Sequence, residues 1–399
     1  MPTLNFSLIS SIPLTEACQQ FNQQRSLVDD INIQQLDWQN AWSKLVHTSV
    51  SHTPEDVAEI GTTWIEDLRS TGALHAFTQR EVEAIGDRQA FIPASWSSCI
   101  DPKTGQVWAI PWTLDTRLIF YRKSILKKIG IDPFAAFNTD EAFKNTLQKL
   151  KKQGIPCPLA IPTRQNPTLL HVAASWVWDA GGSFMSLDGK KTGFAEPEAL
   201  EGLQRYFELG QFLSPDARDL EAEQSDGLFS EGKAAVAISG PWLLFQGQSL
   251  LEDVGFTLLP GVPFIGGSNL VIWQRSVDLN ASLALVEFLT GAPFQGTYFV
   301  NSGRMAGYMP TRLEALSSPA FAQDLRYRTI SDGLKKGRSF KLVPGWGMME
   351  GRLNAMLSKT WSNIFSDPEK DYHAIVDDDM KKMARLLDFS LERLYGATM

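Results

Sequence analysis

The chain has 399 residues, and because a single hydrophobic core rarely grows beyond roughly 250 to 300 residues, we expect two lobes. Hydrophobic residues make up 43% and charged residues 21% of the chain, which is ordinary globular composition. The net charge of -8 argues against a general nucleic-acid binder, because such proteins need a basic surface to displace phosphate counterions. No run approaches the roughly 20 apolar residues that span a bilayer, so the sequence predicts a soluble globular protein.

The N-terminal part of the chain alternates short apolar runs with helical patterns. Strands are predicted at 4–9, 31–36 and 56–61. A helix is predicted at 14–21, with Ser11 or Thr15 as its cap, and a second helix begins near Trp38. This alternation predicts a mostly parallel sheet covered by helices, in which ligands lie beyond the carboxyl ends of the strands.

The middle of the chain contains two apolar runs within 105–123, which we interpret as a strand passing from one lobe to the other. Helices are predicted at 140–153, capped by Asn138 or Thr139, and at 166–181 and 197–213. Further on, the pattern predicts strands at 234–239, 254–259 and 269–273 and a helix at 281–289, and the last third is mainly helical.

The motifs of common enzyme classes are incomplete in this sequence. The segment 227–234 resembles a phosphate-binding loop, but Ala234 stands where the magnesium-binding Ser or Thr belongs, and the order is helix to strand. No GxS triplet has the second glycine of a nucleophile elbow. A glycosidase pair of carboxylates stays open as an alternative, because sequence does not measure the distance between two carboxylates. The candidates for such a pair are Glu66, Asp67, Asp115 and Asp179.

Neither a metal nor a cofactor is expected. The five histidines include no HExxH motif. Cys18, Cys99 and Cys157 are far apart and show no CxxC spacing, so we expect them to pack as small hydrophobic side chains, with at most one pair bridged.

The tryptophans carry the strongest functional signal that the residues give by themselves. Twelve are present, and several lie near glycine or proline in apparent loops. These are Trp64, Trp96, Trp112, Trp242 and Trp346. Because an aromatic ring offers an apolar face to the C–H side of a sugar while neighbouring polar groups take its hydroxyls, this placement favours carbohydrate binding.

Several segments, in order, resemble the family 1 extracellular solute-binding proteins, the maltose-binding-like components of ABC importers. The segment 109–132 is similar to the family's "GLP … T … LYYNKDLFEKAGL", and 228–242 to "F … GKAAM … GPW". Weaker similarity covers 56–74, 266–290 and 303–310. The family's tyrosine-tyrosine-asparagine is Phe120-Tyr121-Arg122 here.

The resemblance implies an α/β, two-lobe periplasmic-binding-protein fold of type II, with a ligand cleft between lobes that crossing hinge strands join. Lobe 1 would comprise 1–112 and 267–312, and lobe 2 would comprise 113–266 and 313–399. The protein would capture a mono- or oligosaccharide by hinge closure and deliver it to the permease subunits of an ABC importer. It would act as a monomer, without catalysis, at the periplasmic or extracellular face of the membrane. Since the N-terminus lacks signal-peptide features, we expect an export signal that is not part of this chain.

Ten residues in the matching segments are candidates for contacts to the ligand. They are Trp64, Asp115, Arg117, Trp178, Trp242, Gly267, Ser268, Arg304, Tyr308 and Trp346. Trp178 is preferred over Trp176, because rings two residues apart do not share a helical face. Arg117 and Arg304 favour a neutral or acidic ligand over a polyamine.

Three alternatives remain open at this point. In the first, the protein binds a different ligand, such as an amino-sugar, a polyol or a polyamine. In the second, it is a glycoside-active enzyme. In the third, it is a ligand sensor that partners a membrane receptor.

Overall fold

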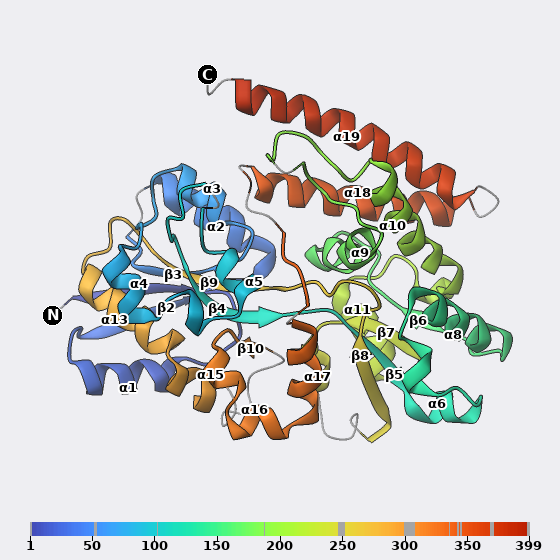
Figure 1. Cartoon of the computed structure of the whole chain (residues 1–399), viewed down its shortest axis with the longest axis horizontal. Helices are drawn as coiled ribbons and strands as arrows, with labels where there is room; N and C mark the ends of the chain where they lie inside the picture. The colour runs from blue at the N-terminus through green and yellow to red at the C-terminus, as the bar shows by residue number, and fades with distance from the viewer. Residues whose placement is uncertain are drawn as a thin grey trace. The chain divides into compact units, whose positions relative to one another are not determined.

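The computed structural model describes residues 2–51, 54–101, 103–186, 188–245, 252–298, 308–334, 336–340, 343, 345–367 and 371–396. The chain forms two compact units (Figure 1). Unit 1 comprises Met1–Thr116 and Ile265–Gly347, and unit 2 comprises Arg117–Phe264 and Met348–Met399. Two of the three boundaries lie within four residues of those drawn from the sequence, at 112 and 266.

The third boundary lies at Gly347, whereas the sequence-based division placed it at Arg312. The intervening residues belong with unit 1 for a packing reason. Helix α15 (Leu313–Leu316) contacts strand β10 (Met309–Pro310), and the Ile265 N–H donates to the Arg338 carbonyl at 2.8 Å.

Unit 1 is built on a six-stranded sheet with the order β10-β4-β9-β3-β1-β2. The strands besides β10 are β1 (Thr3–Leu8), β2 (Asp30–Gln35), β3 (Val57–Gly61), β4 (Ile110–Asp115) and β9 (Gly266–Ile272). β1 pairs in parallel with β2 and β3, whereas β9 is antiparallel to β3 and β4, and β10 is antiparallel to β4. The sheet is therefore mixed, and the expectation of a mostly parallel sheet is wrong for β9 and β10.

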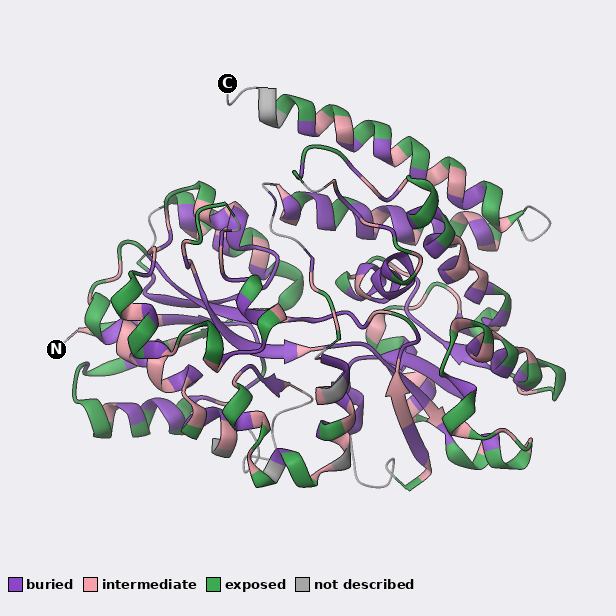
Figure 2. Ribbon diagram, viewed as in Figure 1, coloured by how far each residue is buried: buried purple, intermediate pink, exposed green. Residues whose placement is uncertain are grey.

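Helices cover the unit 1 sheet, and Figure 2 shows buried strands beneath helices that are exposed on one face. Besides α15, they are α1 (Thr15–Arg25), α2 (Trp38–Ser51), α3 (Ile65–Ser70), α4 (Gln79–Ile85), α5 (Pro93–Ser97), α13 (Leu279–Thr290), α16 (Pro319–Gln323) and α17 (Leu325–Leu334). The expected cap of α1 is wrong: Leu14 occupies the N-cap position, and no side chain accepts a hydrogen bond there.

Unit 2 has a four-stranded sheet with the order β6-β7-β5-β8. Its strands are β5 (Leu118–Arg122), β6 (Leu159–Ala160), β7 (Val236–Ser239) and β8 (Val254–Leu258). β6 and β7 are parallel, and β5 is antiparallel to both β7 and β8. Its helices are α6 (Lys123–Lys128), α7 (Pro133–Ala136), α8 (Asp140–Lys152), α9 (Pro167–Asp179), α10 (Pro197–Phe207), α11 (Ala222–Ser230), α18 (Trp346–Ser366) and α19 (Tyr372–Gly396).

The start of α8 shows how sequence determines a helix end in unit 2. Thr139 is the N-cap, and its hydroxyl accepts a hydrogen bond from the Ala142 N–H at 3.1 Å. One of the two expected caps is therefore confirmed. Phe143, Leu147 and Leu150 then recur at helical spacing and are buried, so the helix packs along one apolar face.

Arg122, the departure from the family pattern, has a structural explanation. Its guanidinium donates to the carbonyls of Phe229 and Ser230, the last residues of α11, and its Cζ lies 4.9 Å from the centre of the Phe229 ring. The carbonyl end of a helix carries partial negative charge, so a cation is favourable there. Arg122 therefore fastens α11 to the strand β5.

Several tryptophans that the sequence placed in loops belong to regular structure. Trp96 lies in α5, and Trp112 lies in β4, where it is fully buried and stacks on Phe294 with ring centroids 5.9 Å apart. The loop interpretation is wrong for both residues. Pro93 begins the helix that contains Trp96, and Pro111 lies within the strand that contains Trp112. Their rings fill the core of unit 1.

Cys18, Cys99 and Cys157 are all buried, free thiols. Burial raises the pKa of Cys18 to about 12 and raises the pKa values of the other two thiols. Among the described helices, none is long and apolar enough to cross a membrane.

Glu55 precedes β3 and carries a buried carboxyl group, with 8% of the residue exposed. The Ser7 hydroxyl donates to it at 3.0 Å. Burial raises the pKa of Glu55 to about 7, and the charge of Asp56 adds to the effect. Because the folded protein holds this proton more tightly than the unfolded chain, folding is favoured at low pH, and this contribution is lost as pH rises from roughly 4.5 to 7.

Replacing Glu55 by Gln should therefore raise the free energy of unfolding at pH 8 by about 1–2 kcal/mol and leave it nearly unchanged at pH 4. Gln retains an oxygen for the Ser7 hydroxyl but carries no charge. Urea unfolding followed between pH 4 and pH 8 measures the effect. Glu83→Gln, at an exposed position of α4, is the control and should keep the pH slope of the wild type. Identical slopes for Glu55→Gln and the wild type would contradict the assignment.

Candidate functional site

Strand pairing in unit 1 brings one set of strand ends to a single edge of the sheet. β1, β2, β3 and β4 run in one direction and β9 and β10 in the other, so the carboxyl ends of the first four lie beside the amino ends of the last two. We call this the unit 1 edge. In sheets with parallel strands, ligands bind beyond the carboxyl ends.

Two tryptophans follow the strands β2 and β3, which lie on either side of β1 in this sheet. Trp38 comes after β2, Trp64 comes after β3, and their rings meet edge to face with centroids 5.7 Å apart. Trp64 is 9% exposed and covers Gly61, where an added Cβ would lie 3.0 Å from its ring. Trp38 is 36% exposed. Trp64 is therefore largely covered and packs against Trp38, whose ring is the more accessible of the two.

Tyr308 completes this cluster from the residue preceding β10. The Trp38 indole donates a hydrogen bond to the Tyr308 hydroxyl. Burial raises the pKa of Tyr308, and the negative charges of Glu59 and Asp115 raise it further. Asp115 is the last residue of β4 and pairs with Gly266 across the ladder. A phenol and a carboxylate thus stand beside the aromatic pair, as hydrogen-bonding groups for a polar ligand.

The fully buried carboxylate of Glu59 organises the polar groups behind this edge. It accepts hydrogen bonds from the N–H groups of Ile9 and Ser10, at 2.9 and 2.7 Å, and from the Ser268 hydroxyl at 2.5 Å. Burial raises the pKa of Glu59, and these hydrogen bonds oppose the rise. Ser268 is itself fully buried and lies 2.7 Å from the Thr113 hydroxyl. Its hydroxyl is thus held by the protein.

Gly267 permits the close pairing of β9 with β4. Its φ of +125° lies in the region that favours glycine, and an added Cβ would lie 2.0 Å from the Thr113 carbonyl oxygen. The register of the two strands shifts between Pro111 and Thr113, beside this glycine.

A second cluster lies at one edge of the unit 2 sheet. Leu118, the first residue of β5, pairs with Ser239 at the end of β7 and with Leu258 at the end of β8. Arg117 precedes β5, and Trp242 and Phe264 follow β7 and β8, so all three belong to this unit 2 edge.

The guanidinium of Arg117 connects the aromatic rings of the unit 2 edge. Its Cζ lies 5.2 Å from the centre of the Trp242 ring and 5.5 Å from that of Phe264, distances typical of cation–π contacts. Arg117 is 3% exposed. Its Nη2 donates to His171 Nδ1 at 2.7 Å. The Trp242 indole donates to Asp226 at 2.8 Å, and burial raises the pKa of Asp226.

The two neighbouring tryptophans of α9 face different surroundings. The Trp178 ring is nearly parallel to Phe264, with centroids 6.4 Å apart, which brings it to the unit 2 edge. Trp176 instead packs on Tyr206, and its indole donates to Asp140 at 2.9 Å. The prediction that the two rings do not share a face is confirmed.

Trp346 is buried beside the helix α3 that follows Trp64. It is the first residue of α18 and belongs to unit 1, where it is 2% exposed and packs on Phe340 with centroids 4.9 Å apart. Asp67 accepts hydrogen bonds from the Gly345 and Gly347 N–H groups on either side, at 3.0 and 2.9 Å. Burial accounts for the raised pKa of Asp67. Arg304 lies outside the described residues.

Three of the four carboxylates considered for catalysis lie outside the strands of the unit 1 edge and take part in ion pairs or hold a helix start. Glu66 forms an ion pair with Arg69 at 2.5 Å, Asp179 forms one with Arg205 at 3.3 Å, and Asp67 holds the start of α18. Only Asp115 among them stands at the unit 1 edge with Tyr308. Within the described part of the chain, no group of three or more His, Cys, Asp or Glu side chains is placed to hold a metal ion.

Sequence reasoning missed Trp38, Glu59, His171, Asp226 and Phe264. For Trp38 a signal existed, because it follows β2 as Trp64 follows β3. Its helical spacing with Trp42 and Leu45 suggested a core position instead.

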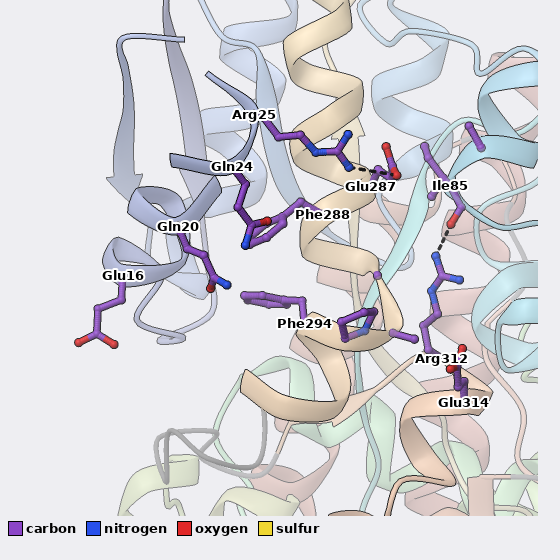
Figure 3. A pocket seen from close by; sticks show the side chains of 14 residues that line it. Glu16, Gln20, Gln24, Arg25, Ile85, Glu287, Phe288, Phe294, Arg312 and Glu314 are labelled. Atoms are coloured by element: carbon purple, nitrogen blue, oxygen red, sulfur yellow. Dashed lines mark hydrogen bonds and ion pairs between the residues drawn. The ribbon is translucent and has the colours of Figure 1, made fainter. Parts of the chain in front are cut away.

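A groove of about 820 Å³ lies elsewhere in unit 1, between residues of α1, α4 and α13 (Figure 3). Arg25 and Glu287 form an ion pair across it at 3.3 Å. Arg312 donates to the carbonyls of Ile85 and Thr290, the last residues of α4 and α13. None of the ten candidate ligand contacts lines this groove.

The chain belongs to the family described as bacterial extracellular solute-binding protein, whose sequence profile matches residues 16–296. This match covers β2, β3, β4 and β9 of the unit 1 sheet and all four strands of the unit 2 sheet.

Individual relatives and solved structures agree with the family. The chain is 23% identical to the diacetylchitobiose binding protein DasA of Streptomyces coelicolor, over 79% of this chain and 74% of that protein. It is also 23% identical to the maltotriose-binding protein of Pyrococcus abyssi, over 80% and 67%. The sugar-binding protein MalE of Xanthomonas citri has the same fold, with a TM-score of 0.82, 21% identity and 99% coverage of both chains. The fold is thus that of the two-lobe periplasmic binding proteins.

Substitution of Gly267 by Ala should destabilise the protein by about 2–4 kcal/mol, because a Cβ collides with the Thr113 carbonyl and the φ is unfavourable. Gly72→Ala is the matched control, since Gly72 has a φ of +71° but no atom within 4 Å of an added Cβ. Its cost should be about 1 kcal/mol. Chemical denaturation of both variants measures the difference. Equal losses would show that the close approach to β4 does not constrain this position.

Proposed function

We propose that this protein captures a carbohydrate, a mono- or oligosaccharide, and delivers it to the membrane subunits of an ABC importer. The observation that carries the proposal is the chemistry of the two edges. Each edge combines aromatic rings with fixed hydrogen-bonding groups, Trp38 and Tyr308 in unit 1 and Trp242 and Arg117 in unit 2. A sugar needs both kinds of contact, because its C–H faces are apolar and its hydroxyls are polar.

The roles of the candidate residues follow from their burial. Trp38 supplies the ring that stacks on the sugar, and Trp64 holds that ring from behind. Asp115 and Tyr308 take hydroxyl groups. Gly267 and Ser268 shape the edge from within, because the Ser268 hydroxyl is held by Glu59.

In unit 2, Trp242 provides the aromatic contact, and Arg117 holds its ring through the cation–π contact. Phe264 also contacts the Arg117 guanidinium, and the Trp178 ring lies nearly parallel to that of Phe264.

The ligand class is supported by the ligands for which the relatives and structural neighbours are named or with which they were solved. They include diacetylchitobiose, maltotriose, maltose and tagatose. A neutral saccharide also suits the unit 2 edge, where the charged groups Arg117 and Asp226 already contact aromatic side chains.

Capture would proceed by hinge closure, in which a ligand that contacts both units stabilises one of their arrangements by population shift. The importer subunits would bind that arrangement. We propose that the protein acts as a monomer on the periplasmic or extracellular side of the membrane, without nucleic acid as a partner and without chemical change to the sugar. The partners that hold Glu66, Asp67 and Asp179 support the last point.

A thermal-shift screen should identify the ligand class. Maltose, maltotriose, diacetylchitobiose and tagatose are the test compounds, and ribitol and spermidine represent the polyol and polyamine alternatives. A ligand at 100 times its dissociation constant stabilises the folded state by about 2.7 kcal/mol, so at least one saccharide should raise the melting temperature. A response to spermidine alone would contradict carbohydrate capture. Cleavage of maltotriose during overnight incubation would instead favour the glycoside-active enzyme.

Replacing either Trp38 or Trp242 by Ala should weaken the binding of the best saccharide about tenfold, because each substitution removes a ring that stacks on the sugar. Isothermal titration calorimetry measures the affinity. Phe134→Ala is the control, since Phe134 is 86% exposed on α7 and touches neither edge, so its affinity should be unchanged. Wild-type affinity in the Trp38 variant would remove that ring from the site.

A further inference from the structure

His171 lies in α9 at the centre of the unit 2 edge, although no sequence motif marks it. Its ring stacks on Phe264, with centroids 4.2 Å apart and an interplanar angle of 12°. Nδ1 lies 2.7 Å from Arg117 Nη2, and Nε2 lies 3.4 Å from Glu350 Oε1 in α18. Its side chain is 16% exposed. Both ring nitrogens therefore face charged groups.

The partner at Nδ1 determines the tautomer. A guanidinium has only donors, so Nδ1 must accept the hydrogen bond from Arg117 and carries no proton. The ring proton of neutral His171 is then on Nε2, directed at the Glu350 carboxylate. In this tautomer, His171 accepts a hydrogen bond from Arg117 at Nδ1 and directs its Nε2 proton at Glu350.

We infer that His171 is a positioning residue of the binding site: its neutral ring holds Arg117 on the face of Trp242, and protonation of His171 releases that contact. The inference deepens the proposed function and rests on it for its effect on the ligand. His171 acts through Arg117 and need not touch the sugar itself.

Protonation has this effect because the new proton goes to Nδ1. Two donors, both on cations, then face each other where a donor and an acceptor stood 2.7 Å apart. The imidazolium is drawn instead towards Glu350, on the other side of the ring.

Among the residues that the structure describes, the charges around His171 come from three parts of unit 2. Arg117 precedes β5, Glu350 lies in α18, and Asp226 in α11 reaches the cluster through the Trp242 indole. Phe264, after β8, contributes an apolar face. Within α9, the N–H of the adjacent Leu170 is held by the neutral Asn354 amide at 3.0 Å. Arg117 is the group that protonation displaces, because it alone among these donates to the ring.

The consequence for the protein is a site that weakens in acid. The contact between Arg117 and Trp242 should therefore be present while the His171 ring is neutral and should loosen when acid protonates it. Loss of one charge-assisted hydrogen bond corresponds to a change of about tenfold in affinity.

The first test needs no sugar. The Trp242 indole N–H resonance, assigned with Trp242→Phe, should shift with pH in the wild type with the same midpoint as the His171 ring. In His171→Asn the part of the shift that has the His171 midpoint should disappear, because the Asn amide oxygen still accepts from Arg117 but does not titrate in this range. Any shift caused by titration of Asp226, which accepts the hydrogen bond from the Trp242 indole, should be the same in both proteins. A Trp242 resonance that is constant in the wild type, or that shifts equally in His171→Asn, would overturn the inference.

The second test measures maltotriose binding by calorimetry from pH 5 to pH 8. Wild-type affinity should fall about tenfold towards pH 5, His171→Asn should bind almost independently of pH, and His171→Phe, which keeps the ring but has no acceptor, should bind weakly throughout. Equal pH slopes in the wild type and His171→Asn would contradict the role of His171. Absence of saccharide binding at every pH would count against the proposed function, and the resonance experiment would then decide on His171 alone.

Discussion

The close approach of β9 to β4 at Gly267 is the constraint on which the unit 1 edge depends. Only a residue without a side chain lets the backbone pass the Thr113 carbonyl there. The approach allows β9 to pair with β3 on one side and β4 on the other, and β4 in turn pairs with β10. Residues that are some 240 positions apart in the sequence, from Trp64 to Tyr308, thereby reach one edge of one sheet. The grouping of the proposed ligand contacts of unit 1 follows from strand pairing and not from a local motif.

Buried charges maintain both edges, each by a different means. In unit 1 the Glu59 carboxylate accepts three hydrogen bonds and fixes the Ser268 hydroxyl. In unit 2 the Arg117 guanidinium is held by aromatic faces and by His171. Burying a charge is costly unless it is paired or hydrogen-bonded, so such groups lose much of their freedom to rearrange. Rigid polar groups of this kind suit recognition, in which a site must be organised before the ligand arrives.

The order of strands and helices could be predicted from the sequence, because apolar periodicity and caps such as Thr139 are local signals. The family could also be predicted, from ordered segments such as 228–242, and it is confirmed by the profile match. The direction in which the strands pair could not be predicted, because β9 and β10 join the sheet from distant parts of the chain. The burial of aromatic rings could not be predicted either. The sequence suggested a loop for Trp112 and a core position for Trp38, yet Trp112 fills the core and Trp38 is 36% exposed. The ten candidate contacts remain predictions.

Hydrogen–deuterium exchange with and without a saturating saccharide tests most directly whether one unaltered sugar engages both halves of the chain. Backbone amides around Trp38 and Trp64 and those around Trp242 should gain protection together at the same sugar concentration, and mass spectrometry should recover the sugar intact. Protection confined to one unit, or conversion of the sugar to a product, would contradict the account.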